Sequence, residues 1–549
     1  MRWSLALVVV LLIALACAPS PPVIPADPDG EIHVLGSEPL PHHLDPQQAL
    51  VVTEVGQVSL LFDTLLTYDH SGTKLVPSLA EALPQVSADG LTYTVRLRSG
   101  LVYSDGRALT ARDFVFAYRH LCDAATASDL AFSGFIVAGC ERYHADDATR
   151  TPPDQLARDR EAVGVVAQDD RTLAYRLTAR AAYFPHLLAS WLTAPTREDV
   201  VAKGDLWTEA GTLVGNGYFR LASWTHRGRM VFERNELHQP KAKLKRIVME
   251  LALSGGPNAA LAAFRNGELD VLPVSADLKP TVDADPALAP QTVAVDSPCT
   301  TFFALNVRRP PFDDASVRLA FAKSFDRATW SREQLGGLGA PTATFVPPGI
   351  PGYDATDDTQ AFDVPAARAL VAGSRYAAGL PPVRLTIVGA ASLKRQLQPV
   401  VDGWHSALGV DAQLSPLDPA TLRDLTRSPQ TYPQMMVEGW CAAYPDAQDF
   451  LSLMFTMATT VGHTNYASPA YDDLVRRADA EADATVRASL YRDAQRTLTK
   501  DAPAIFASSA RSLTLVATRV HGHSLTPLDR VFSQFTLGEV FVPLRPKGS

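Results

Sequence analysis

The chain has 549 residues, of which 46% are hydrophobic and 20% are charged, and its formal net charge at pH 7 is −9. A chain of this length exceeds what a single compact core accommodates, so we expect two to four domains. Acidic and basic residues are interspersed, which argues against the basic face that nucleic-acid binding needs, and we expect no nucleic-acid partner.

Residues 1–17 have the pattern of an export signal. Arg2 provides a positive charge before an unbroken apolar run, which is too short to span a bilayer but typical of a secretory signal. The sequence A-L-A-C that ends at Cys17 resembles a bacterial lipobox, so we expect Cys17 to carry a lipid. The alternative is ordinary signal cleavage nearby with an incidental cysteine. We therefore expect an exported, membrane-anchored lipoprotein, periplasmic or on the cell surface, with the proline-rich residues 18–30 as an extended linker.

Residues 75–121 predict a short helix, a turn, a β-hairpin, a second turn and a capped helix. The hairpin strand at 92–97 is β-branched and alternates, as a half-buried strand does. Thr110 lies three residues before Asp113, which is the spacing of a capping box at the start of a helix. One face of that helix is expected to carry Phe114, Ala117 and Tyr118.

The rest of the chain shows the same mixture of strand and helix signals. The patterns predict a strand at 31–36, a helix at 52–61, a strand at 172–177, and an amphipathic helix with a following strand within 259–274. Gly267 lies between that helix and strand, where a helix end needs the left-handed conformation. These elements indicate an α/β protein.

Four further cysteines follow the export signal: Cys122, Cys140, Cys299 and Cys441. An even number in an exported chain suggests two disulfides, and four cysteines allow three pairings. A local bridge between Cys122 and Cys140 would close a polar loop and contribute about 3 kcal/mol in the chain-entropy model. Because no two of them have CxxC spacing, we expect neither a zinc site nor redox catalysis.

The motifs resemble those of the oligopeptide and dipeptide solute-binding proteins of ABC importers, family 5. Residues 75–121 contain SADGLTYTVRLRSG and SDGRALTARDF, similar to the family's S.DGLTYTFxLRxG and SDGxPLTAxDF. Residues 303–330 resemble a second family block, and residues 466–479 and 487–503 resemble its closing helices. Matched stretches run from about residue 31 to about residue 517. In some oligopeptide-binding relatives a disulfide corresponds to Cys299 with Cys441.

The resemblance implies a two-lobed α/β clam, a type II periplasmic-binding-protein fold of cluster C, with an extra subdomain in the first lobe. Ligand is then expected between the lobes, which close around it by a hinge movement. The implied boundaries are 1–17 signal peptide, 18–30 linker, 31–70 with 205–298 and 512–549 as lobe I, 71–204 as the inserted subdomain, and 299–511 as lobe II.

Residues 436–455 (MVEGWCAAYPDAQDFLSLMF) resemble the family's ligand-site block, GWCADYxDPxxFL. Within it, the resemblance implies ligand-site roles for Trp440, Ala443, Tyr444 and Asp446. In relatives an aspartate at the position of Ala443 pairs with the α-amino group of the peptide, because a buried ammonium group needs a counter-charge. Asp446 is either a substitute for that aspartate or a turn and helix-cap residue.

This chain also has fewer of the other polar residues with which the family's ligand site holds a peptide. Val437 stands where relatives carry an arginine, and Arg427 is either a second such arginine or a solvated loop residue. Glu38 lies in a segment that resembles the family's GxEP and is a further ligand-site candidate. Trp440 either lines the cleft or belongs to the core. We therefore expect a cleft more apolar than that of a general peptide binder, suited to peptides with blocked amines or to amphiphiles.

Two other classes of function are weighed against a peptide receptor. An enzyme is disfavoured because the sequence lacks HExxH, GxSxG, Walker and GxGxxG motifs. Metal, metal-chelate or haem capture would rest on His42-His43 and His521-Gly522-His523. A surface strand explains these histidines better, because no nearby cysteine or carboxylate completes a ligand set. We expect no cofactor, a monomer, and a permease and ATPase complex as partner, with a ligand sensor of the same fold as an alternative.

Overall fold

The structure is a computed structural model that describes residues 24–36, 41–50, 52–70, 72–147, 149–389, 391–426, 428–457, 464–524 and 537–544. Cys17, Glu38 and Arg427 therefore lie outside the described residues. Within these ranges, no helix combines the length and the apolar character needed to cross a membrane.

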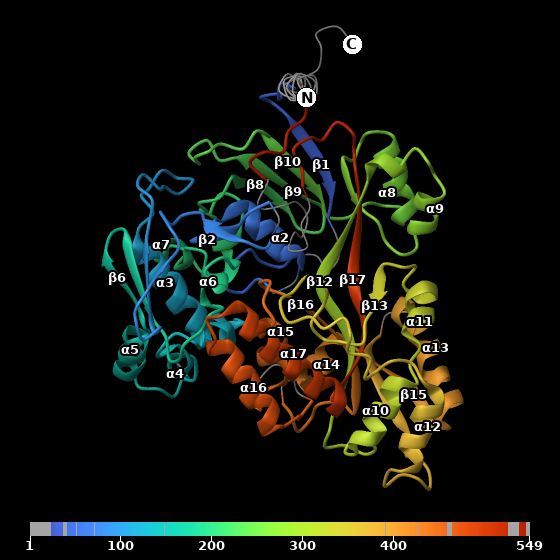
Figure 1. The fold of residues 1–549 in the computed structure, drawn as a ribbon. Coiled ribbons are helices and arrows are strands. Elements are labelled where there is room, and N and C mark those ends of the chain that lie inside the picture. Colours follow the sequence, from blue (N-terminus) through green and yellow to red (C-terminus); the bar gives the residue numbers. More distant parts are fainter. Residues whose placement is uncertain are drawn as a thin grey trace, which may run out of the picture.

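One long mixed sheet runs through the molecule (Figure 1). Its strand order is β15-β14-β16-β12-β17-β11-β1-β10-β9-β8, with β13 paired to β17. The strands are β1 (Glu31–Leu35), β8 (Phe219–Thr225), β9 (Arg229–Arg234), β10 (Arg246–Glu250), β11 (Val271–Pro273), β12 (Thr292–Leu305), β13 (Gly339–Pro341), β14 (Val383–Val388), β15 (Ala412–Leu417), β16 (Met435–Cys441) and β17 (Ala504–Val516). Parallel pairs join β1 to β10 and β11, and β14 to β15 and β16.

The strands β12 and β17 connect an upper and a lower lobe (Figure 1). They pair antiparallel along most of their length, from Thr292 opposite Leu515 to Ala304 opposite Ala504. Leu515 belongs to a core cluster of the upper lobe, whereas Ala304 belongs to one of the lower lobe. The predicted two-lobed α/β fold is confirmed.

The upper lobe packs helices against the β1 end of the sheet. Its helices are α2 (Val52–Leu61), α8 (Gly256–Arg265) and α9 (Lys279–Asp283). After α8, Gly267 has a φ of 75°, the left-handed conformation predicted for the end of this helix. A core of β1, α2 and the strands β8 to β10 fills the lobe on one side, and α8 and α9 enclose a smaller cluster.

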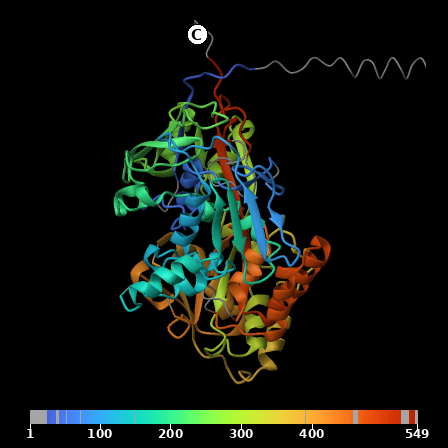
Figure 2. The same cartoon turned by 90° about the vertical axis from the view of Figure 1, so that its left-hand side faces the viewer.

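A smaller unit with its own core packs beside the two lobes, and Figure 2 shows it in the foreground. Its four-stranded sheet has the order β4 (Gln85–Val86), β5 (Thr92–Arg96), β7 (Thr172–Arg176) and β6 (Val165–Asp169). The surrounding elements are β2 (Leu66–Tyr68), β3 (Leu75–Pro77), α3 (Ala111–Cys122), α4 (Cys140–His144), α5 (Pro153–Ala162) and α6 (Phe184–Leu187). The helix α7 (Glu198–Val201) follows in the chain and packs in the core of the upper lobe. A disulfide joins Cys122 to Cys140.

The predicted details of this unit are confirmed except at its start. The capping box of α3 is present, with the Thr110 backbone N–H donating to the Asp113 carboxylate at 2.7 Å. The short helix expected at the start of residues 75–121 is wrong, because Leu75–Pro77 forms β3 and Ala80 bridges to Leu97, the residue that follows β5.

Helices cover both faces of the sheet in the lower lobe (Figure 1). They are α10 (Ala315–Lys323), α11 (Arg327–Gln334), α12 (Val364–Ala372), α13 (Ala391–Leu408), α14 (Pro419–Thr426), α15 (Gln448–Phe455), α16 (Pro469–Ala480) and α17 (Ala484–Asp501). One core cluster lies against α15 to α17, and a second lies against α10, α11 and α13. The strand β16 lies between the two clusters, because its residues alternate between them.

Candidate ligand-binding site

The outer edge of β16 is only partly paired. Its inner edge pairs with β12 along the whole strand, from Cys441 opposite Cys299 to Met435 opposite Leu305. Its outer edge pairs with β14 only at Met435 and Met436. Beyond Met436, the described part of the chain places no strand along this outer edge.

The direction of the backbone groups along β16 follows from two bonds to β12. The Ala442 N–H donates to the Pro298 carbonyl at 2.9 Å, and the Asn306 N–H donates to the Gln434 carbonyl at 3.0 Å. Even-numbered residues of this segment therefore face β12, because backbone groups of successive strand residues point to opposite edges.

The odd-numbered residues of β16 face outward. The Val437 N–H still takes part in the pairing with β14, because the parallel bridge between Thr386 and Met436 uses it. Past this pairing, Gly439 and Cys441 offer N–H and carbonyl groups to an added strand. Gly439 is exposed, and no atom lies within 4 Å of the position that a Cβ would take there. Cys441 is held to Cys299 by the second disulfide, which confirms that expected pair. Among the described residues, β16 is therefore paired along its whole inner edge, and beyond Met436 no strand lies along its outer edge.

Asp449 fixes the turn that follows this edge. Its side chain is buried, and its carboxylate accepts the Trp440 indole N–H at 3.0 Å and the Ala443 backbone N–H at 3.2 Å. Trp440 also packs against the lower-lobe core but keeps part of its surface accessible. Its contact with the core is therefore established, whereas its expected place in the lining of the cleft stays a prediction.

The next residue, Tyr444, belongs to the contact between the lower lobe and the inserted unit. Its ring is 1% exposed and stacks on Tyr183 at a centroid distance of 6.3 Å, and its hydroxyl donates to Gln448 at 2.5 Å. The Ala182 N–H also donates to the Asp479 carbonyl across this contact, at 3.0 Å. Tyr444 thus joins two parts of the protein, which argues against its expected place in the ligand cleft.

Asp446 is already paired within the protein. Its carboxylate is 2% exposed and is held in bidentate fashion by Arg487 of α17, with one N–O distance of 2.7 Å. The same carboxylate accepts the Gln448 N–H at 2.9 Å, at the start of α15. This geometry supports the turn and helix-start role of Asp446 and argues against its use as a counter-charge for a ligand amine.

A second buried acid lies close to this ion pair. Asp479 accepts hydrogen bonds from Tyr491 at 2.6 Å and from Ser452 at 2.8 Å. Burial raises the pKa of Asp479 to about 6, although the hydrogen bonds and Arg487 act in the opposite direction. Neither Asp479 nor Arg487 was identified from the sequence.

Glu438 is a further functional candidate that sequence reasoning missed. It lies on β16 between Met436 and Trp440 on the same face, and the Tyr432 hydroxyl donates to its carboxylate. Burial raises the pKa of Glu438 to about 7. An acidic residue within an otherwise apolar strand is a signal that the sequence already carried.

The upper lobe contributes an apolar pocket of about 450 Å³ at the carboxyl ends of β1, β10 and β11. Leu35, Leu251, Pro257 and Leu278 are among its lining residues. β1 points from the upper lobe toward the lower one in Figure 1, so this end of the sheet faces the region between the lobes. Carboxyl ends of parallel strands are frequent ligand positions in α/β proteins.

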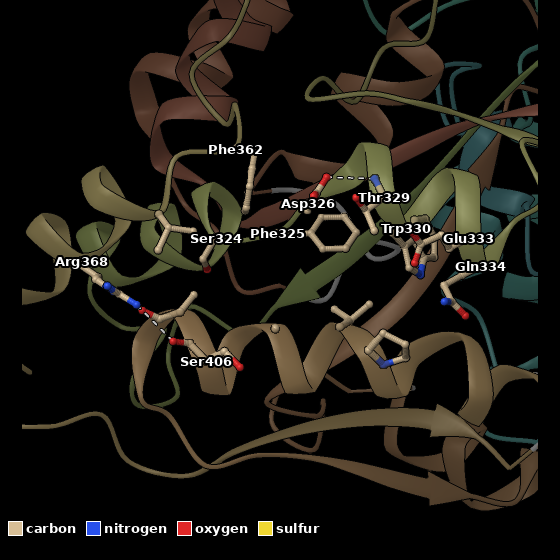
Figure 3. Close-up of a pocket in the computed structure, with 15 residues that line it drawn as sticks. Ser324, Phe325, Asp326, Thr329, Trp330, Glu333, Gln334, Phe362, Arg368 and Ser406 are labelled. Carbon is tan, nitrogen blue, oxygen red and sulfur yellow. Dashed lines mark hydrogen bonds between the residues drawn. The ribbon is translucent and has the colours of Figure 1, made fainter.

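A second pocket, of about 380 Å³, lies away from the strand edge, among the helices of the lower lobe (Figure 3). The pocket is surrounded by Phe325 before α11, Trp330 within α11, Phe362 before α12, and α13. The clusters His42-His43 and His521-Gly522-His523 show no complete set of metal ligands among the described residues. In the described ranges, no group of three or more histidine, cysteine or acidic side chains is placed to hold a metal ion.

Comparisons with known proteins point to one family. The model of the bacterial extracellular solute-binding proteins, family 5 middle region, matches residues 74–461. A probable deoxycholate-binding periplasmic protein of Escherichia coli is 29% identical over 503 residues, 90% of this chain and 91% of that protein. The periplasmic oligopeptide-binding protein of Salmonella typhimurium is 29% identical over 507 residues, 89% of each chain.

Solved structures agree with this assignment. The Haemophilus influenzae oligopeptide-binding protein in complex with the peptide RPPGFSPFR has a TM-score of 0.76 and 26% identity, covering 95% of this chain and all of that one. The overall folds therefore correspond along nearly the whole chain.

Proposed function

Because the chain belongs to the bacterial extracellular solute-binding proteins of family 5, we propose that it is the substrate-binding lipoprotein of an ABC importer. In this proposal, peptides or peptide-like ligands bind between the two lobes and are delivered to a membrane permease. The family consists of solute-binding proteins rather than enzymes, and relatives are named for binding oligopeptides and dipeptides.

The observation that carries this proposal is the open outer edge of β16. An extended peptide that lies along Gly439 and Cys441 pairs its backbone with theirs, as in other complexes in which a peptide adds a strand to a sheet. Backbone pairing does not depend on the peptide's side chains, so it suits a receptor for many sequences. The absence of the family aspartate at Ala443 removes one anchor for a free α-amino group.

The proposal includes the remaining parts of the chain. Cys17 would carry the lipid, and residues 18–30 would tether the body to the membrane near the permease and its ATPases. The separate core clusters support 299–511 as lobe II and an inserted subdomain within about 71–204. At the ends of that subdomain they differ, because Leu66 packs in its core and Val200 packs in the core of the upper lobe. We expect the protein to act as a monomer.

Isothermal titration tests the strand-edge mode directly. Replacing Gly439→Pro removes the outward N–H while leaving the inner edge paired, since proline is tolerated where a strand's N–H faces outward. We expect G439P to weaken binding of N-acetylated tri- to pentapeptides by about tenfold, one lost hydrogen bond in a dry site. The matched control, G439A, keeps the N–H and meets no atom within 4 Å. Equal affinities for wild type and G439P would refute the strand-edge mode.

The same titrations address the ligand's amino terminus. We expect acetylated and free peptides to bind with similar affinity, because Ala443 offers no carboxylate and Asp446 is paired with Arg487. Tight binding of free tripeptides alone would contradict this expectation.

A second candidate function is capture of a non-peptide amphiphile. Two observations favour it: a relative of 29% identity is named as a probable deoxycholate-binding protein, and the upper-lobe pocket is apolar. Titration with deoxycholate in parallel with the peptides separates the two candidates. Binding of deoxycholate that G439P leaves unchanged, with no peptide binding, would favour the amphiphile. Mass spectrometry of ligand that co-purifies with the protein would then identify the compound.

A further inference from the structure

Glu438 has no basic partner in the described structure. Its carboxylate accepts a hydrogen bond from the Tyr432 hydroxyl, and no lysine, arginine or histidine of the described residues lies within ion-pair distance. The other acids nearby are engaged: Asp446 is paired with Arg487, and Asp449 accepts two N–H groups. Glu438 is thus a half-buried acid whose counter-charge is not supplied by its described surroundings.

The side chain of Glu438 lies on the same face of β16 as those of Met436 and Trp440. Met436 and Trp440, two residues away on either side, pack against one core cluster, whereas Val437 packs against the other. Glu438 shares the face of Trp440 and keeps part of its surface accessible, and its neighbour Gly439 is exposed. A ligand strand beside Gly439 therefore lies next to the Glu438 carboxylate.

The Glu438 carboxylate is partly shielded from water, because it lies beside the Tyr432 hydroxyl and on the face of β16 that packs against the lower-lobe core. Burial raises its pKa to about 7, although the hydrogen bond from Tyr432 acts in the opposite direction. A carboxylate open to bulk water would keep its ordinary pKa, because water stabilises the charged form. A buried carboxylate regains stability when a cation enters beside it and donates hydrogen bonds.

The geometry of an added strand determines where that cation would come from. Side chains of paired strands share a face when their residues are opposite each other, with Cβ atoms about 4.5–5.5 Å apart. Lysine and arginine side chains are long enough to reach the Glu438 carboxylate from such a position. We propose that Glu438 selects ligands that present an ammonium or guanidinium group on this face of the β16 edge. The inference rests on the proposed function and places charge recognition at a point other than Ala443.

Titrations with charge-matched peptides test this inference. The probes are N-acetylated alanine tetrapeptide amides with one lysine or one norleucine at each position in turn, and the unacetylated alanine tetrapeptide amide. The variants are Glu438→Gln, which keeps the shape and removes the charge, Tyr432→Phe, which keeps the carboxylate, and the surface control Glu333→Gln. Thermal melts of all variants check that they fold.

We expect wild type to bind the best lysine peptide about tenfold or more tightly than its norleucine counterpart. E438Q should reduce this ratio of affinities to about one without weakening the binding of the norleucine peptide. Y432F and E333Q should keep the ratio of the wild type. If the unacetylated peptide shows the E438Q-sensitive preference instead, the recognised ammonium is the amino terminus. The inference is overturned if E438Q still prefers the lysine peptide. It is also overturned if wild type binds the norleucine peptides but shows no preference for lysine. No binding of any peptide overturns the proposed function itself.

Discussion

Removal of Arg487 is expected to destabilise the protein far more than loss of a surface charge. Arg487 is 12% exposed and donates to Asp446, to the Tyr491 hydroxyl at 3.0 Å and to the Ala478 carbonyl at 3.1 Å. In Arg487→Met, Asp446 remains 2% exposed with the Gln448 N–H as its one remaining described donor. Breaking a buried ion pair from one side costs about 3–5 kcal/mol, and we expect R487M to lose free energy of unfolding in that range.

Urea denaturation followed by tryptophan fluorescence measures this loss, with two further variants as references. The double variant D446N/R487M removes both charges, so it should recover about half or more of the loss. Arg511→Met breaks a pair with Asp296 whose side chains are 50% and 58% exposed, and it should cost less than about 1 kcal/mol. A loss of less than about 1 kcal/mol in R487M, or no recovery in the double variant, would refute the reasoning.

Three further predictions concern stability. Replacing Cys299 and Cys441 by serine opens a loop with a sequence separation of 142, and thermal melts should show a loss of about 2–5 kcal/mol. Because the folded-state pKa of Asp479 is raised to about 6, the folded chain binds more protons than the unfolded chain between about pH 4 and 6. The contribution of Asp479 to the free energy of unfolding therefore falls as pH rises through that window. Urea denaturation of Asp479→Asn over the same pH range should not show this fall. Arg327 is buried and donates to five backbone carbonyls. In urea denaturation, Arg327→Met should therefore lose about 3 kcal/mol or more of free energy of unfolding. A smaller loss than that of R511M would contradict this prediction.

Much of the fold was predictable because its signals are local. Thr110 and Asp113 lie within one helical turn, and Gly267 alone marks the end of α8, so neighbouring residues suffice to predict both. The helix expected at the start of residues 75–121 failed for a non-local reason. Ala80 bridges to Leu97, and no pattern within the segment itself reveals that pairing.

The candidate site was predictable from the sequence only where its functional residues lie within one continuous segment. The substitution at Ala443 is visible in the sequence, but the pairing of Asp446 with Arg487 spans 41 residues and needs the packing of α15 against α17. Glu438 could have been noticed as a charge within an apolar strand. Its meaning depends on β14 ending its pairing at Met436, which determines that the edge beside Glu438 is open.

The position of β17 has a consequence for how the chain is made. This strand spans Ala504–Val516, near the end of the sequence, yet it lies between β12 and β11 in the middle of the sheet. Until it emerges from the ribosome, the sheet is missing the strand that joins its two halves, and neither lobe has its final hydrogen-bonding partner. Residues 1–503 are therefore synthesised before the strand that completes the sheet, and truncation before residue 504 should leave the sheet in two separate halves.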